Sequence, residues 1–134
     1  MSNQDGENDY LNNFNYFRKS LENLQEDADI QCKSLDYFNV AWEIKNDVIN
    51  LGKGVLNTTD TQLSETQKSR ITKIIEDTAS IPIRVINVPN LREFHLISMS
   101  DACWVPLRAQ AKQLLSVLRS EIERVKSALD IKDS

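Results

Sequence analysis

The chain has 134 residues and a formal net charge of −4, with 40% hydrophobic and 27% charged residues. This balance is typical of a globular chain rather than a disordered one, and the acidic excess disfavours nucleic-acid binding, which usually needs a basic stripe. No apolar run approaches the roughly 20 residues of a membrane-spanning helix, so we expect no membrane segment. Two Cys and one His are too few for a disulfide scaffold or a zinc site.

The N-terminal stretch MSNQDGENDY is polar and acidic. It has neither the basic region nor the apolar region of a secretory signal, so we expect a cytoplasmic protein. Residues 1–8 are expected to form a disordered tail, and residues 9–130 a single helical domain. Glycine occurs only three times in the chain, which disfavours turn-rich β architectures.

Apolar residues that alternate by four and three predict a first helix over residues 9–28. They are Tyr10, Phe14, Phe17, Leu21, Leu24 and Ala28. A second helix is predicted over residues 31–52. Gly52 and Gly54 follow its apolar positions, and we interpret them as its C-terminus, where a left-handed residue is common.

A third helix is predicted over residues 65–79, because Ser64 and Gln67 have the spacing of a capping box. The segment 81–97 breaks the helical pattern with two prolines around a β-branched run. Proline restricts the preceding residue to extended conformations, so this segment is expected to cross the end of the bundle as an extended apolar strap. Residues 91–97 are expected to add a short helix, and a β-hairpin over residues 83–97 is the alternative.

The last helix is predicted over residues 106–129, again from spacings of four and three. Pro106 suits a first helical turn, and Trp104 is expected to fold onto the bundle end as an apolar plug. The predicted fold is therefore an all-α, four-helix up-down bundle with an extended or partly helical insertion at about 81–97. Its expected core is Phe14, Phe17, Leu21, Leu24, Leu35, Phe38, Trp42, Ile71, Ile74, Leu114, Leu118, Ile122 and Val125.

The stretch before the last helix also contains Cys103, eight residues after His95. A cysteine near a helix N-terminus can be an activated nucleophile if a base takes its proton. The preferred interpretation is a helix entry with a buried, inert thiol. A disulfide between Cys32 and Cys103 is a further alternative, since both are expected near the same end of an up-down bundle.

Charge is distributed unevenly along the chain. Residues 1–47 carry ten acidic and four basic residues, a net of −6, whereas residues 48–134 carry ten acidic and twelve basic residues, a net of +2. An acidic face can complement a basic partner. We therefore expect a non-enzymatic interaction module, most simply a small acidic inhibitor or immunity-type protein that binds a basic protein. The expected contact residues are Glu22, Glu26, Asp27, Asp29 and Asp36.

Two other functions remain open, and neither they nor the inhibitor requires an organic cofactor. A Mg²⁺-dependent helical nucleotide hydrolase would need four carboxylates from two facing helices to converge on the metal. The candidates are Glu22, Glu26, Glu43 and Asp47. A structural or oligomeric bundle, including a homodimer, would instead leave a large apolar patch exposed on the monomer, with residues 81–97 and Trp104 as candidates.

Overall fold

The computed structural model describes residues 3–58 and 62–130, and all regular secondary structure in this part of the chain is helical. Its α-helices are α1 (Asn3–Leu24), α2 (Ala28–Ser34), α3 (Val40–Leu56), α4 (Glu65–Ala79), α5 (Ile83–Ile86), α6 (Arg92–Met99), α7 (Val105–Val117) and α8 (Arg119–Ala128), and a 3-10 turn, η1 (Ala102–Trp104), precedes α7. The predicted all-α class is confirmed, with eight α-helices among the described residues rather than four. None of these helices is long and apolar enough to cross a membrane.

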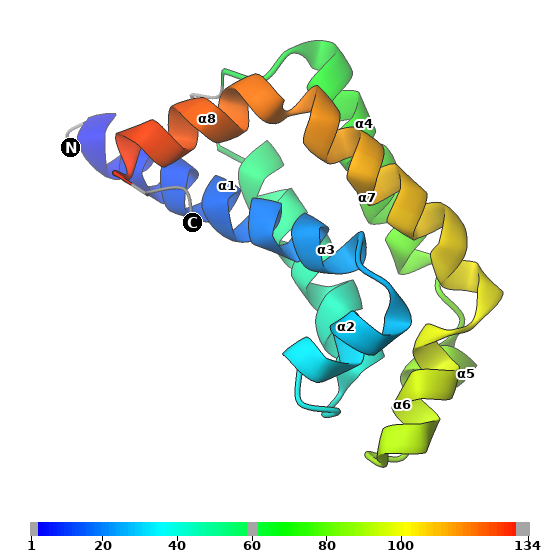
Figure 1. Ribbon diagram of the computed structural model, residues 1–134. Helices are drawn as coiled ribbons and strands as arrows, with labels where there is room; N and C mark the ends of the chain where they lie inside the picture. The colour runs from blue at the N-terminus through cyan, green and yellow to red at the C-terminus, as the bar shows by residue number, and fades with distance from the viewer. Residues whose placement is uncertain (1–2, 59–61, 131–134) are drawn as a thin grey trace.

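The body of the molecule is formed by helices that pack in a ring. Helix α1 packs on α3 and α7, and α4 packs on the same two helices, while α8 also packs on α1. Helices α2, α5 and α6 gather at the end of the molecule remote from the start of α1 and the end of α8 (Figure 1). Most of the predicted core is buried: Phe14, Phe17, Leu21, Leu24, Ile71, Ile74, Leu114, Leu118 and Val125. Leu35 and Ile122 are partly buried against it.

The first two predicted helices have different bounds in the structure. Helix α1 covers Asn3–Leu24 rather than residues 9–28, and residues 1–2 of the predicted tail lie outside the described residues. The predicted helix over residues 31–52 is two helices, α2 and α3. Three residues of their connection have left-handed φ angles: Asp36 (53°), Tyr37 (54°) and Asn39 (43°). A run of such angles without glycine is unfavourable and persists only when surrounding contacts hold it.

This break overturns part of the predicted core. Phe38 is 58% exposed and Trp42 is 48% exposed, although both were expected inside. The chain leaves the helical path at residues 35–39, so the spacing that would carry these two side chains along one buried face is interrupted. Both prove to lie on the surface at the start of α3.

Gly52 and Gly54 lie within α3, which continues to Leu56, so their interpretation as a helix C-terminus is wrong. Neither glycine has a positive φ angle. Gly52 instead permits close packing, because a Cβ atom there would lie 2.8 Å from Ile75 Cδ1 and 3.1 Å from Phe17 Cε1. The lack of a side chain lets α3 approach α1 and α4.

Helix α4 begins and ends where the sequence predicts. The Ser64 hydroxyl accepts a hydrogen bond from the Gln67 backbone N–H (3.1 Å), and the Gln67 side chain accepts one from the Ser64 N–H (2.8 Å). The capping box is therefore confirmed. The Gln67 amide also donates to the carbonyl of Val117 (3.1 Å), which ties the start of α4 to the end of α7.

The region from residue 81 to residue 129 differs from the prediction in two ways. The insertion is more helical than expected, and the last predicted helix is broken into two. The insertion contains α5 and α6, so the short helix over residues 91–97 is confirmed, and the extended strap and the β-hairpin are not found. The last predicted helix is divided at Leu118 into α7 and α8. The helix entry is confirmed: Trp104 is fully buried, and its indole N–H donates to the Ser98 carbonyl (3.1 Å).

Candidate interaction surface

The five carboxylates expected to contact a partner differ in their local contacts and exposure. Glu22 pairs with Arg18 at 2.9 Å and lines a groove of about 720 Å³ between α1 and the α7–α8 pair. Asp27 has a local structural role, because its carboxylate accepts a hydrogen bond from the backbone N–H of Ile30 (3.0 Å) and caps α2. Glu26 is partly buried beside these two. Glu22 and Asp27 therefore have different local contacts.

Asp27, Asp29 and Asp36 are the predicted contact residues that are exposed, and Asp29 and Asp36 have no capping role. Asp29 lies in the first turn of α2, and Asp36 lies in the α2–α3 connection. Because α1 ends at Leu24, the acidic run after it lies at the start of the next helix, where negative charge is favoured. Part of the acidic run is thus explained by helix capping.

Two of the four carboxylates of the metal hypothesis line different grooves. Glu22 lines the groove towards α7 and α8, whereas Asp47 lines another groove between α1 and α3. Partial burial and the nearby charge of Glu43 raise the pKa of Asp47. Across the described residues, no group of three or more His, Cys, Asp or Glu side chains is placed to hold a metal ion. The structure does not bring the predicted ligands together.

Cys103 and His95 do not form a nucleophile and base pair. Burial, with a hydrogen bond and charge from Asp101, raises the pKa of the Cys103 thiol to about 11, which opposes formation of the thiolate. His95 is buried, its Nε2 lies 2.8 Å from Asn90 Oδ1, and burial lowers its pKa. Cys32 and Cys103 are both free thiols, so the alternative disulfide is not present.

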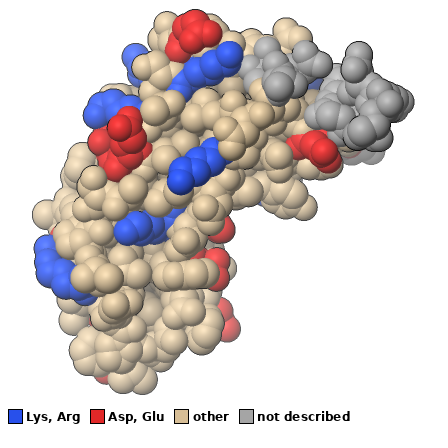
Figure 2. All heavy atoms as spheres, turned by 180° about the vertical axis from the view of Figure 1, so that it is seen from behind, with Lys and Arg blue, Asp and Glu red and all other residues tan. Residues whose placement is uncertain are grey.

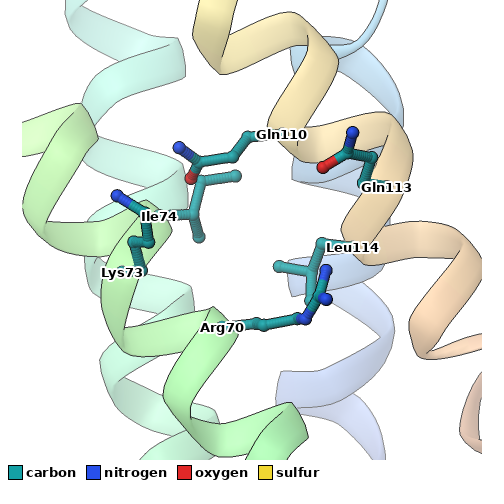
Figure 3. A pocket seen from close by; sticks show the side chains of 6 residues that line it. All are labelled: Arg70, Lys73, Ile74, Gln110, Gln113 and Leu114. Atoms are coloured by element: carbon teal, nitrogen blue, oxygen red, sulfur yellow. The ribbon is translucent and has the colours of Figure 1, made fainter.

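A pocket of about 330 Å³ lies between α4 and α7. Figure 3 shows Arg70 and Gln110 reaching across it from opposite helices, with Ile74 and Leu114 between them. The Gln110 amide donates to Asp77 (2.8 Å), which also pairs with a lysine of its own helix. The bond from the Gln110 amide nitrogen joins the two helices, whereas the buried Gln110 Oε1 accepts no hydrogen bond from the described residues.

The most distinctive surface lies at the end formed by α2, α5, α6 and the first turns of α3 and α7. Nine large hydrophobic side chains of the described residues are exposed, and eight of them belong to this end. We call it the apolar end: Ile30, Phe38, Trp42, Ile83, Leu91, Phe94, Ile97 and Val105. The ninth, Tyr16, lies on α1. Figure 2 shows the lower end of the molecule almost free of charged side chains on the face in view.

Specific polar contacts hold the centre of the apolar end together. Asn90 Oδ1 accepts a hydrogen bond from the backbone N–H of Asn39 (3.0 Å) and lies within hydrogen-bond distance of His95. The guanidinium of Arg92 lies over the ring of Tyr37, 5.0 Å from its centroid. These contacts join the α2–α3 connection to the start of α6. They therefore hold residues 37–39 close to residues 90–92.

Hydrogen bonds of Arg108 and Gln31 join the helices beneath the surface of the apolar end. Arg108 donates from Nε to the carbonyl of Glu26 (3.0 Å), and its Nη2 donates to Gln31 Oε1 (2.8 Å) and to the Met99 carbonyl. The amide of Gln31 donates to the Leu24 carbonyl (2.9 Å). Desolvation lowers the pKa of the Arg108 guanidinium. This one side chain ties together the end of α1, α2, α6 and α7, although the sequence showed it only as one of several basic residues.

Most charged residues around the apolar end form no ion pair within the described residues, and carboxylates are the more numerous among them. Arg84 is engaged by Asp101 at 2.8 Å, and Arg92 lies over an aromatic ring. Within the described residues, no ion pair involves the other charged side chains, which we call the rim: Asp29, Lys33, Asp36, Glu43, Lys45 and Glu93. The rim thus presents four carboxylates and two ammonium groups to solvent.

Comparison of the chain with protein-family models, with curated proteins and with solved structures found no match. The apolar end offers area for burial, and three of its exposed side chains, Phe38, Trp42 and Phe94, are aromatic. Exposed apolar patches of this kind are typical of protein-binding surfaces, and aromatic residues are enriched at the centres of such interfaces. It is therefore the best candidate for a functional site in this structure.

Proposed function

We propose that the protein is a non-enzymatic interaction module that binds a partner protein through its apolar end. One observation carries the proposal: eight of the nine exposed large hydrophobic side chains belong to that end. Scattered exposed hydrophobic residues need no explanation, but a gathered set costs solubility unless it is covered in use.

The charges of the rim favour a partner whose contact surface has an apolar centre surrounded by basic residues. Four carboxylates against two ammonium groups would attract such a partner and speed its association. This keeps the expected function of a small acidic inhibitor and narrows its contact residues. Asp29 and Asp36 stay in the proposed surface, whereas Glu22 is paired with Arg18 and Asp27 caps a helix.

We further infer that the helical body is a four-helix up-down bundle that serves as a platform for the apolar end. The ring of packing that joins α1, α3, α4 and α7 supports this interpretation. Residues 81–97 then form the insertion that supplies four of the eight exposed side chains of the binding surface. A reducing, cytoplasmic setting is part of the proposal, and the free thiols of Cys32 and Cys103 are compatible with it.

The proposal is tested by affinity capture with three forms of the full chain. They are the wild type, the double variant Phe38→Gln/Trp42→Gln, and the control variant Tyr16→Gln. All three substituted residues are exposed, so each form should fold. We expect one partner to be retained by the wild type and the control, with at least about tenfold less retained by the double variant, since aromatic anchors carry much of an interface's energy.

The contribution of charge is tested separately. Asp29→Asn/Asp36→Asn should slow association and weaken the dependence of capture on salt, because rim charges act mainly on association. Glu22→Gln is the matched control, since it lies in another groove. Equal capture by the wild type and the aromatic double variant would contradict the proposal. A melting temperature raised by Mg²⁺ or Mn²⁺ would instead favour the hydrolase.

A further inference from the structure

We propose that a second copy of this chain covers the apolar end when no partner is bound, through a symmetric contact between the two apolar ends. The inference rests on the proposed function, because it describes how the same surface is kept from water between binding events. In a two-fold dimer the same patch lies on both sides of the interface. A self-complementary patch is therefore sufficient, and no other surface is needed.

The exposed apolar area is large enough for such a contact. Exposed fractions at the apolar end run from 39% for Phe94 to 72% for Ile83. A large aromatic side chain offers about 150–250 Å². At these exposed fractions, the three aromatic side chains and the smaller but on average more exposed aliphatic ones each leave on the order of 100 Å² open to solvent. A contact that covers most of them buries roughly 600–800 Å² per copy, close to the ~800 Å² per partner of a standard specific interface.

The rim carries both signs of charge, as a symmetric contact requires. Lys33 lies between the carboxylates of Asp29 and Asp36 in the sequence, and Lys45 lies two residues after Glu43. None of these five side chains forms an ion pair within the described residues. In a symmetric pairing, the ammonium groups of one copy can face the carboxylates of the other.

The excess of carboxylates over ammonium groups in the rim explains why a basic partner would displace the second copy. The rim has four carboxylates and two ammonium groups, so two carboxylates on each copy stay without an opposite charge in the dimer. Uncompensated like charges at an interface weaken it. A basic partner can match all four carboxylates. The self-contact is therefore expected to be the weaker one, with a dissociation constant in about the micromolar range.

Sedimentation equilibrium over a range of about 1 µM to about 500 µM tests the inference, because dimer formation depends on concentration. The average mass should rise from the 15.4 kDa of one chain towards twice that value. Trp42→Gln/Phe94→Gln should stay near 15.4 kDa over the same range, and Tyr16→Gln should follow the wild type. Far-UV circular dichroism of each variant confirms that it is folded.

Iodide quenching of tryptophan fluorescence gives a second, local readout. Trp42 is 48% exposed and Trp104 is fully buried, so nearly all quenching should arise from Trp42. Quenching should fall as the concentration rises and should stay constant in Phe94→Gln, which keeps both tryptophans. A dimer that leaves Trp42 open to iodide would overturn the proposed interface.

The outcomes separate this inference from the proposed function. A wild-type chain that stays at 15.4 kDa, with capture that is still lost in Phe38→Gln/Trp42→Gln, would overturn the second copy and leave partner binding standing. A dimer with no captured partner would do the reverse. Protection of Trp42 by vesicles of phosphatidylcholine and phosphatidylglycerol, with the mass unchanged, would show a lipid surface as the occupant and overturn the inference.

Discussion

Replacement of Gly52 by alanine tests the close packing between α3 and its two neighbours. A Cβ atom at this position would lie 2.8 Å and 3.0 Å from two side-chain carbons of Ile75, and 3.1 Å from the ring of Phe17. Phe17 is fully buried and Ile75 nearly so. Both side chains are packed in the core, so the added methyl group must displace one or both of them.

The expected magnitude comes from two opposing effects. Overpacking a well-packed core costs about 1–3 kcal/mol, whereas alanine is favoured over glycine inside a helix by about 1 kcal/mol. The neighbouring Gly54→Ala supplies the control, because its Cβ atom would lie 3.6 Å from Asn13 Nδ2, an ordinary contact. Both variants gain the helix preference, and only Gly52→Ala loses packing, so their difference isolates the packing cost.

Urea unfolding followed by circular dichroism gives the free energy of unfolding of both variants. Gly54→Ala should be more stable than the wild type by about 0.5–1 kcal/mol. Gly52→Ala should be about 1–3 kcal/mol less stable than Gly54→Ala. If the two variants had equal stability, the packing argument at Gly52 would be refuted.

Three further substitutions test polar contacts. Tyr10→Phe removes the buried hydroxyl that donates to Glu121, and urea unfolding should show a loss of about 1.5–3 kcal/mol, as for other hydrogen bonds to charged groups. Burial lowers the pKa of His95. Near pH 6.5 the unfolded chain therefore binds a proton that the folded chain does not, so wild-type stability should fall as the pH drops through about 6.5. His95→Gln should weaken this pH dependence in urea unfolding curves measured from about pH 7 to about pH 5. The pairing with Arg84 and the backbone N–H of Cys103 lower the pKa of Asp101 to about 2, so its contribution is present above about pH 4 and lost towards pH 2. The difference in melting temperature between the wild type and Asp101→Asn should therefore shrink over that interval, and a constant difference would contradict the assignment.

Local patterns in the sequence predict the body of this molecule well. The bounds of α4 can be predicted because the capping box and the apolar residues at helical spacing are both local signals in the sequence. The core positions of α1 follow from the same spacing, since a helix that packs on one side repeats its buried residues every three or four positions. These features need no knowledge of distant contacts.

The breaks in the helices cannot be predicted in the same way. The connection between α2 and α3 contains neither glycine nor proline, yet three of its residues have left-handed φ angles. Contacts from residues more than fifty positions away help to hold it, including the hydrogen bond from Asn39 to Asn90. Gly52 was misinterpreted for a related reason, because its packing against Phe17 and Ile75 is visible only in three dimensions.

The candidate site was predicted only in part. Residues 81–97 were proposed as an exposed apolar patch and supply four of its eight exposed side chains, but Trp104 is buried, and Phe38 and Trp42 were expected in the core. Helical spacing cannot tell a buried apolar residue from an exposed one that binds a partner. The two tryptophans show the difference. A buried tryptophan usually needs an acceptor for its indole N–H, and Trp104 finds one in the Ser98 carbonyl. Trp42 forms no such hydrogen bond within the described residues. An exposed indole ring can bury apolar area in an interface, and its free N–H can orient the partner through a hydrogen bond. We therefore expect the surface that covers Trp42 to place an acceptor against its indole N–H.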